Sequence, residues 1–461
     1  MKSVVRLSTA LLSAIAALSL ACADPERVSD PRSALSLDRT TAPGLGQACS
    51  DRPGLHLARR PNAPLELLCA FTLPSGSSPI LNGTKSWVDG GRYYLTELKN
   101  ASVYVFDVVS HAAVGHVPGF TTTLNADGSL NGTRSGPNSI TFSGDGHAWV
   151  SDGNSNVRVV DLSSMSFVAT VSTAIAACDN GTVHNCQRTN EITYDPEHQI
   201  VFVQNPSPLG VTSGTAIDTY GTFISSVAPY TVLGTITFPN RQGQEAPLWD
   251  PDQHRILTAV SGRQVVNRTV TPHVVTAVFH QYVAVIDPAV RPFTIEHEYD
   301  IDCTALGLTD APTTTGTTSN PTGRRFGIND PTLGPDGHIV IPGCSRALIM
   351  DARTGGILAV RREIGGGNET WYNSGDGNFY VTGIDSTRTS PVNSLGVIDA
   401  RSIALLQAVP AVGATNPAAA AENNEIFSVV PANAATTACT AFGFQASGCI
   451  LVFAHVPGAA N

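Results

Sequence analysis

The sequence repeats one short pattern along most of its length. Residues 139–152 read SITFSGDGHAWVSD, in which two runs of alternating apolar residues flank a Ser-Gly-Asp-Gly turn. Related stretches return as EITYDPEHQIVFVQ at 191–204 and as DPTLGPDGHIVIPG at 330–343. Apolar residues at every second position, with turns rich in Gly, Asp and Pro, are typical of antiparallel β-hairpins. A chain that repeats one hairpin in this way is expected to fold into an array of equivalent β units.

Two further strands follow each hairpin, which gives units of four strands, named a to d in chain order. Strand c is the clearest and ends near an Asp, and strand d follows it after a short turn. The clear c strands are VYVFDV (103–108), VRVVDL (157–162), VAVIDP (283–288), ALIMDA (347–352) and GVIDA (396–400). The sequence accommodates seven such units, and no segment with helical periodicity competes with them.

Units of four strands at this spacing predict an all-β fold, the seven-bladed β-propeller. Each blade can bury its faces only against its neighbours, so the array must close into a ring. The seventh unit stops after CILVFA (449–454) and lacks strand d. LELLCAFTLP (65–74), which precedes the first unit, has the pattern of a d strand. We therefore expect 65–74 to complete the last blade and to remove two exposed sheet edges.

The first residues have the layout of an export signal. Lys2 and Arg6 precede the apolar run 7–20, which is shorter than the ~20 residues of a membrane-spanning helix. Cys22 is an alternative site for a lipid anchor. The predicted divisions are a signal peptide at 1–23, a polar lead-in at 24–62 and the propeller at 63–461. The expected location is secreted, periplasmic or at the cell surface.

The cysteine count fits an exported protein. Nine cysteines occur, and eight remain when Cys22 is set aside. An even number in an exported chain predicts disulfide bonds. The predicted pairs are Cys49 with Cys69, Cys178 with Cys186, Cys303 with Cys344, and Cys439 with Cys449.

The connections between strands differ in length on the two faces of the predicted ring. The a–b and c–d turns are short and form what we name the plain face. The b–c loops and d–a connections form the opposite, loop-rich face, where the insertions fall at 118–137, 173–189, 205–220, 261–280, 301–328, 383–394 and 431–448. Long loops on a rigid scaffold usually carry function, so we expect the functional site on the loop-rich face.

Polar residues mark the start of each innermost strand, where the loop-rich face meets the central channel. Lys85 follows Thr84 at this position in the first unit. The predicted ligand-binding residues are Asn138, Asn190, Glu191, Glu245, Asn329, Asp330, Asn368, Glu369 and Asn416. A rim of carboxylates and amides suits a polar ligand or a hard cation such as Ca²⁺, for which the predicted ligands are Glu191, Glu245, Asp330 and Glu369. The alternative is that these residues cap strand starts and bind channel water.

Two other clusters are interpreted as structural. His147, His198, His254 and His338 fall in a–b turns and are expected to be turn residues on the plain face. EHEYDID (296–302) places its acids on one side of an outer strand, where charge discourages edge pairing. GGGNET (365–370) lacks the Lys-Ser/Thr that a phosphate-binding loop needs.

The stretch GPNSITFSGDGHAWVSDGNSNVRVVDLSSMSFVATVS (136–172) resembles the YVTN family of seven-bladed propellers and, more loosely, the NHL repeat. The resemblance implies the fold and no particular activity, because such propellers include enzymes, binding modules and surface proteins. The acidic and amide rim is also similar to that of lactonase-type propellers, which place Glu, Asn and Asp at inner-strand starts.

Three classes of function remain open on the sequence alone. The leading hypothesis is a monomeric, exported propeller that binds a small polar or glycan-like ligand, or an extracytoplasmic protein partner, on the loop-rich face. The alternative is an enzyme, a lactonase-like hydrolase, lyase or isomerase, that uses the acidic rim and a divalent cation. A purely structural surface protein is the third class. The net charge of −10 excludes a basic nucleic-acid binder.

Overall fold

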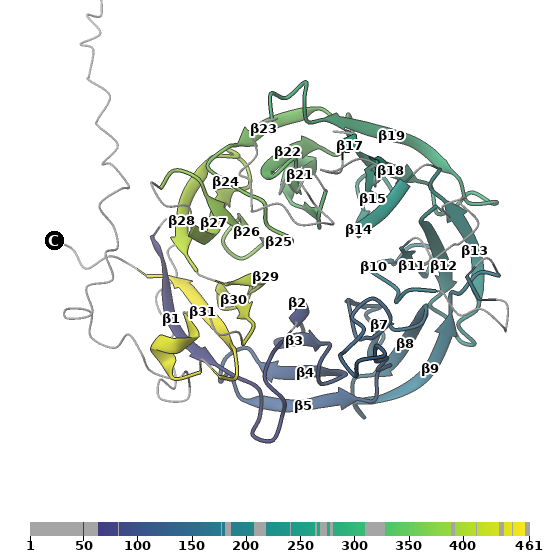
Figure 1. Ribbon diagram of the computed structural model, residues 1–461. Coiled ribbons are helices and arrows are strands. Elements are labelled where there is room, and N and C mark those ends of the chain that lie inside the picture. The colour runs from purple at the N-terminus through teal and green to yellow at the C-terminus, as the bar shows by residue number, and fades with distance from the viewer. Residues whose placement is uncertain are drawn as a thin grey trace, which may run out of the picture. The chain divides into compact units, whose positions relative to one another are not determined.

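The ring of strands is drawn in Figure 1, which shows the computed structural model of the chain. The structure describes Cys49 and residues 63–81, 83–176, 178–179, 186–206, 218–239, 241–262, 265–267, 274–276, 280–308, 328–388, 392–411, 413–432, 438–444 and 446–456. The predicted signal peptide, the Cys22 anchor and almost all of the predicted lead-in lie outside these residues.

Within the described residues, seven antiparallel sheets stand around a central axis as blades. Blade one contains β2 (Gly83–Asp89), β3 (Arg92–Glu97), β4 (Ser102–Asp107) and β5 (Ala113–Pro118). Blade two contains β6 (Ile140–Phe142), β7 (His147–Asp152), β8 (Asn156–Asp161) and β9 (Ser166–Ser172). Blade three contains β10 (Ile192–Asp195), β11 (Ile200–Asn205), β12 (Tyr220–Ser225) and β13 (Val232–Thr237).

The later blades carry small elaborations of the same plan. Blade four contains β14 (Arg241–Asp250), β15 (Arg255–Gly262), β18 (His280–Ile286) and β19 (Ile295–Asp302), with a hairpin of β16 (Val265–Asn267) and β17 (Val274–Thr276) inserted. Blade five contains β20 (Thr332–Leu333), β21 (His338–Gly343), β22 (Arg346–Asp351) and β23 (Ile357–Arg361). Blade six contains β24 (Ile364–Gly365), β25 (Thr370–Asn373), β26 (Asn378–Asp385), β27 (Val392–Asp399) and β28 (Leu405–Pro410). The predicted seven-bladed propeller is therefore confirmed.

Blade seven closes the ring with a strand from each end of the fold. Its strands are β29 (Thr415–Ala420), β30 (Glu425–Val430), β31 (Cys449–His455) and β1 (Leu65–Phe71). β1 pairs antiparallel with β31, which places Leu65 opposite His455 and Phe71 opposite Ile450. Gln407 of blade six also exchanges two hydrogen bonds with the backbone of Leu65, of 2.8 and 3.1 Å. The predicted closure is confirmed, although the strand ends at Phe71, ahead of Pro74, which has no amide hydrogen to donate.

The hydrophobic core is divided into layers between neighbouring blades. Val105, Ile140 and Val150 belong to the layer between blades one and two. Phe202 and Phe223 belong to the layer between blades three and four and are fully buried. Each blade therefore depends on both neighbours for its burial, which makes closure of the ring a condition for stability.

The Asp that ends most c strands has a structural role in the turn to strand d. Asp161 accepts hydrogen bonds from the backbone N–H groups of Ser163 and Ser164 and from both hydroxyls. These bonds lower the pKa of Asp161 to about 2. Asp351 and Asp399 accept equivalent bonds from residues two and three positions later. The Asp of the repeat is thus a turn residue and carries no chemistry.

All eight cysteines outside the predicted signal peptide pair as expected. The S–S distances are 2.06 Å for Cys49–Cys69, 1.93 Å for Cys178–Cys186, 1.98 Å for Cys303–Cys344 and 2.04 Å for Cys439–Cys449.

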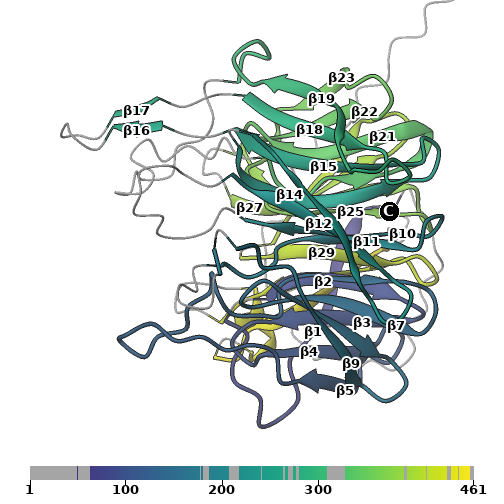
Figure 2. The ribbon, with the colours of Figure 1, turned by 90° about the vertical axis from the view of Figure 1, so that its right-hand side faces the viewer.

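Figure 2 shows that the β16–β17 hairpin projects from the ring on the loop-rich side. No helix among the described residues has the length and apolar character needed to cross a membrane.

Candidate functional site

Irregularities in the inner strands shape the mouth of the channel on the loop-rich face. β2 and β29 each contain a register shift at their first residues, and β14 contains two shifts, the second between Glu245 and Pro247. At each of the shifts next to the mouth, one residue is left out of the ladder. These extra residues are Thr84, Ala246 and Asn416. A β-bulge re-aims neighbouring side chains and frees backbone groups for other partners. The mouth is thus built from backbone that is not committed to sheet pairing.

In blade six, a glycine frees part of the inner strand from sheet pairing. Its inner strand is divided into β24 and β25, which both pair with β26. Gly367 lies at the break, where an added Cβ would stand 1.5 Å from the backbone oxygen of Thr382. Only glycine permits this close approach. The break holds Asn368 and Glu369 at the mouth, so GGGNET is a strand interruption and not a phosphate-binding loop.

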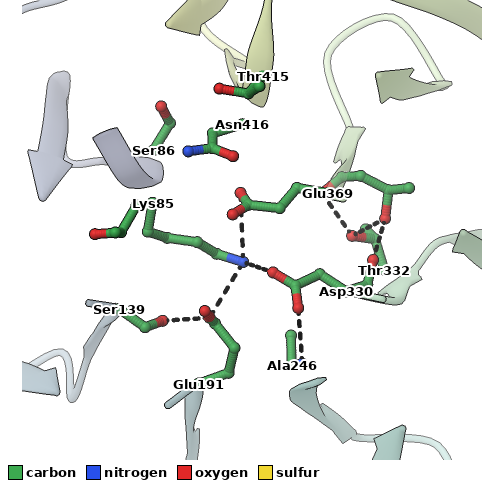
Figure 3. Close-up of polar contacts among 12 residues, drawn as sticks. Lys85, Ser86, Ser139, Glu191, Ala246, Asp330, Thr332, Glu369, Thr415 and Asn416 are labelled. Atoms are coloured by element: carbon green, nitrogen blue, oxygen red, sulfur yellow. Dashed lines mark hydrogen bonds and ion pairs between the residues drawn. The ribbon is translucent and has the colours of Figure 1, made fainter. Parts of the chain in front are cut away.

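A buried lysine lies at the centre of the mouth, surrounded by carboxylates from three other blades (Figure 3). The Lys85 Nζ atom lies 2.6 Å from Asp330 Oδ2, 3.3 Å from Glu191 Oε2 and 3.6 Å from Glu369 Oε2. The exposed fractions of the four side chains are 7%, 3%, 6% and 2% respectively. Blades one, three, five and six therefore meet at one charged centre.

Neutral groups hold two of these carboxylates in place. Ser139 donates a 2.5 Å hydrogen bond to Glu191 Oε2. The backbone N–H of Ala246, freed by the bulge in β14, donates to Asp330 Oδ1 at 2.9 Å. Asn138 donates to Asn190 Oδ1 at 3.0 Å and to Glu191 Oε1 at 3.4 Å.

Glu245 lies at the outer edge of this cluster. Its Oε2 atom accepts a weak 3.5 Å hydrogen bond from Asn190, and both side chains keep part of their surface exposed. Burial, together with the charges of Asp330 and Glu191, raises the pKa of Glu245 well above its usual range. Glu245 therefore belongs electrostatically to the cluster without touching Lys85.

Burial and neighbouring charges shift the pKa values of the groups in this cluster in opposite directions. Burial and the charge of Asp330 raise the pKa of Glu191 to about 7, against the pull of Lys85. Burial also raises the pKa of Glu369 well above its usual range. Burial alone would lower the pKa of Lys85, but the three carboxylates around it outweigh burial and raise it. Lys85 thus stays charged while protons remain on some of the glutamates at neutral pH.

One oxygen of the cluster has no partner. Glu369 Oε1 is buried and accepts no hydrogen bond from any residue that the structure describes. Its other oxygen lies 3.6 Å from Lys85 Nζ, beyond hydrogen-bond length. A buried acceptor without a donor is costly, so Glu369 is the least satisfied member of the cluster.

The predicted rim residues divide into two groups. The structure brings together Asn138, Asn190, Glu191, Glu245, Asp330 and Glu369. The other three have local roles: Asn329 donates to the backbone of Gly367 at 2.6 Å, Asn416 donates to the backbone of Gly83, and the Asn368 side chain is exposed.

Lys85 is the member that the site prediction omitted. It occupies the same inner-strand position as the acids, and a lone cation within an acidic ring predicts a salt bridge. Ser139 and Ala246 could not be found, because their contacts depend on neighbouring blades and on a bulge. The expected neutralising cation is thus the chain's own ammonium group.

The oxygens of three of the predicted Ca²⁺ ligands surround Lys85 Nζ, and no three of these carboxylates place ligand atoms within 4.8 Å of one another. Among the described residues, the only trio of potential ligand atoms found within 4.8 Å of one another comes from Cys49, Cys69 and His111. These two cysteines form a disulfide bond and are not free to bind metal. The predicted Ca²⁺ ligands Glu191, Asp330 and Glu369 instead contact the Lys85 ammonium.

Aromatic side chains meet on the axis beyond the charged cluster, toward the plain face. Trp87 and Trp371 follow Lys85 and Glu369 by two residues, and their ring centroids lie 5.0 Å apart. Their blades, one and six, lie on either side of blade seven, and both contact its inner strand β29. Phe142 of blade two lies 6.3 Å from Trp87. Small residues in β29, from Ala418 to Ala420, leave room for this contact.

The two clusters interpreted as structural have local partners. His147 contacts Asp145, His198 contacts Asp195, His254 contacts Glu197 and His338 contacts the backbone of Ala400. On β19, Glu296 pairs with Arg255, Glu298 with Arg241 and Asp300 with His280. Three of the four acids of this outer strand are thus paired within their own blade, and Asp302 accepts hydrogen bonds from the backbone N–H groups of Thr304 and Ala305.

Comparisons with known proteins bear on the fold alone. No protein-family model and no curated protein matches the chain. Many solved structures match, among them a chain of the structure titled "Crystal Structure of Mitotic Checkpoint Complex". That match has a TM-score of 0.51 and 10% sequence identity, and covers 84% of this chain and 93% of that chain. Fold and site together define the class as a seven-bladed β-propeller with a charged channel mouth.

Proposed function

We propose that this protein is an exported β-propeller that binds a small polar ligand at the loop-rich mouth of its channel. The observation that carries the proposal is the buried centre of Lys85, Glu191, Asp330 and Glu369. Burying an ion pair seldom stabilises a fold more than well-packed apolar residues of similar volume would. A buried, incompletely satisfied charge cluster at the mouth of a channel is therefore better explained by a ligand than by stability.

Three further observations support this proposal. The aromatic rings of Trp87 and Trp371 lie beyond the cluster on the side of the plain face, so we expect a ligand to enter from the loop-rich face. Glu245 and Asn190 keep part of their surface exposed and are positioned to contact an arriving ligand. The four cysteine pairs support export, because disulfides persist in oxidising compartments.

The proposal is tested by a ligand screen against the mouth. Thermal-shift screening of glycans, polyols and short peptides, followed by calorimetry of the hits, should identify ligands. Glu245→Gln should weaken binding more than tenfold, about 1.4 kcal/mol, with little change in melting temperature. Asp145→Asn, in an exposed turn of the plain face, should change neither. Ligands whose affinity is the same in all three proteins would contradict a site at the mouth.

The alternative function is an enzyme of the hydrolase, lyase or isomerase type. It is favoured by Glu191, whose pKa of about 7 suits a general acid or base at neutral pH. Lactone and glycoside turnover that is lost in Glu191→Gln, while the protein remains folded, would support the enzyme. Binding of the same compounds without turnover would support the binding module.

A further inference from the structure

Among the residues that the structure describes, the mouth holds more acidic than basic side chains. The charged groups that act on its centre are Lys85 on β2, Arg188 before β10, Glu191, Glu245, Asp330 and Glu369, and the Tyr93 hydroxyl on β3 senses Glu369. Among the described residues, two cations thus face four carboxylates. With all groups ionised, the cluster would carry an uncompensated charge of roughly −2 in a poorly solvated place, which is unfavourable.

Glu369 shows where the missing partner would bind. Its Oε1 atom is buried and has no donor among the described residues. Figure 3 shows its carboxylate directed at the same centre as Lys85 and Asp330. The side chain is held there by the glycine-dependent break between β24 and β25, whose backbone also accepts hydrogen bonds from Asn329 and Asp330 of blade five. The site therefore lacks both a positive charge and a hydrogen-bond donor at one position.

We infer that the ligand of this mouth carries a primary ammonium group, as in an amino sugar or a short diamine. An ammonium supplies charge and three N–H donors together, and charge-assisted hydrogen bonds are the stronger ones. A neutral polyol supplies donors without charge. A divalent metal ion supplies charge but needs several oxygens in one shell, and no three of these carboxylates place ligand atoms within 4.8 Å of one another. The inference rests on the binding function proposed above.

The inference also predicts how protons accompany binding. The glutamates that hold protons in the free protein must ionise when an ammonium arrives, so binding releases protons to the buffer. A neutral ligand leaves the same protons in place. Affinity for the ammonium should therefore rise with pH between about pH 6 and 8, because the free protein then holds fewer of these protons.

The experiment compares two probes that differ only in charge. Titration calorimetry of the full chain uses 1,4-diaminobutane and 1,4-butanediol, which have the same carbon chain with ammonium or hydroxyl ends. The diamine should bind at least tenfold more tightly, and its heat should vary between buffers of different ionisation enthalpy. Glu369→Gln should remove most of this preference. Glu245→Gln provides a second test at a partly exposed position, and Asp145→Asn is the control.

The possible results of this experiment separate the ammonium inference from the proposed binding function. Equal affinity for the two probes, no binding of either, or diamine binding unchanged in both Gln variants would overturn the ammonium inference. Binding of the diol or of a neutral glycan that is lost in Glu245→Gln would leave the proposed function standing while refuting the ammonium. Binding insensitive to every rim substitution would refute the proposed site as well.

Discussion

At the scale of single residues, the molecule is organised around Lys85. One ammonium group contacts carboxylates from blades three, five and six, so it links parts of the ring that are distant in sequence. The pair with Asp330 is the shortest of these contacts, and both side chains are buried. Lys85 therefore links three other blades to blade one, and its charge also influences the protonation of the carboxylates at the mouth.

Replacing Lys85 by Met tests the structural part of this role. The change leaves Asp330 buried without its partner, and losing one member of a buried pair costs about 3–5 kcal/mol. The free energy of unfolding in urea at pH 7 should fall by about that amount. Arg92→Met is the control, because its pair with Asp107 is more than a third exposed and contributes about 0–1 kcal/mol. Equal losses in the two variants would argue against a special role for Lys85.

Glu191 makes stability depend on pH in an unusual direction. Its pKa is about 7 in the folded protein and close to 4.5 in the unfolded chain, so the folded state binds more protons between these values. Stability is then highest below about pH 4.5 with respect to this group and decreases as pH rises to 7. Urea midpoints should fall between pH 5 and 8. In Glu191→Gln the decrease should be smaller, and an unchanged slope would contradict the assignment.

At the scale of elements, the repeat in the sequence predicts the blades and their closure well. Each four-strand unit depends on alternation and turn residues, which are local properties of the chain. The missing strand of the seventh unit predicts a closing strand within 65–74, because every blade needs a d strand. The bulges at Thr84, Ala246 and Asn416 could not be predicted, since they depend on how partner strands align. Alternation alone therefore located the rim but could not show which side chains converge.

Removing the closing strand should expose two sheet edges. A variant that lacks the residues up to Pro74 loses β1 and is expected to aggregate, because β31 and the open ring present unpaired backbone groups. A variant that lacks only 24–45 keeps β1 and should melt cooperatively. Size-exclusion chromatography and thermal melting distinguish the two. A soluble, cooperative protein without β1 would refute the role of closure.

The disulfides should differ in their effect on stability. Cys303–Cys344 spans 41 residues and joins blade four to blade five, whereas Cys178–Cys186 spans 8. A longer closed loop restricts the unfolded chain more, so the expected contributions are ~4 and ~2.5 kcal/mol. Paired Cys→Ser variants, measured by urea unfolding, give these values. Peptide mapping without reduction should show both links, and free thiol at any of the four would contradict the pairing.

At the scale of the whole molecule, the way the ring closes determines on which face the chain enters and leaves the propeller. β31 ends and β1 begins at the plain face, because Leu65 lies opposite His455 and the N–H of Val456 donates to the backbone oxygen of Pro64. The chain thus enters and leaves the described propeller at one edge of that face. A molecule attached to a support at this edge would carry Glu245 on the face turned away from the support. Its mouth would then face the medium, where a passing solute meets it first.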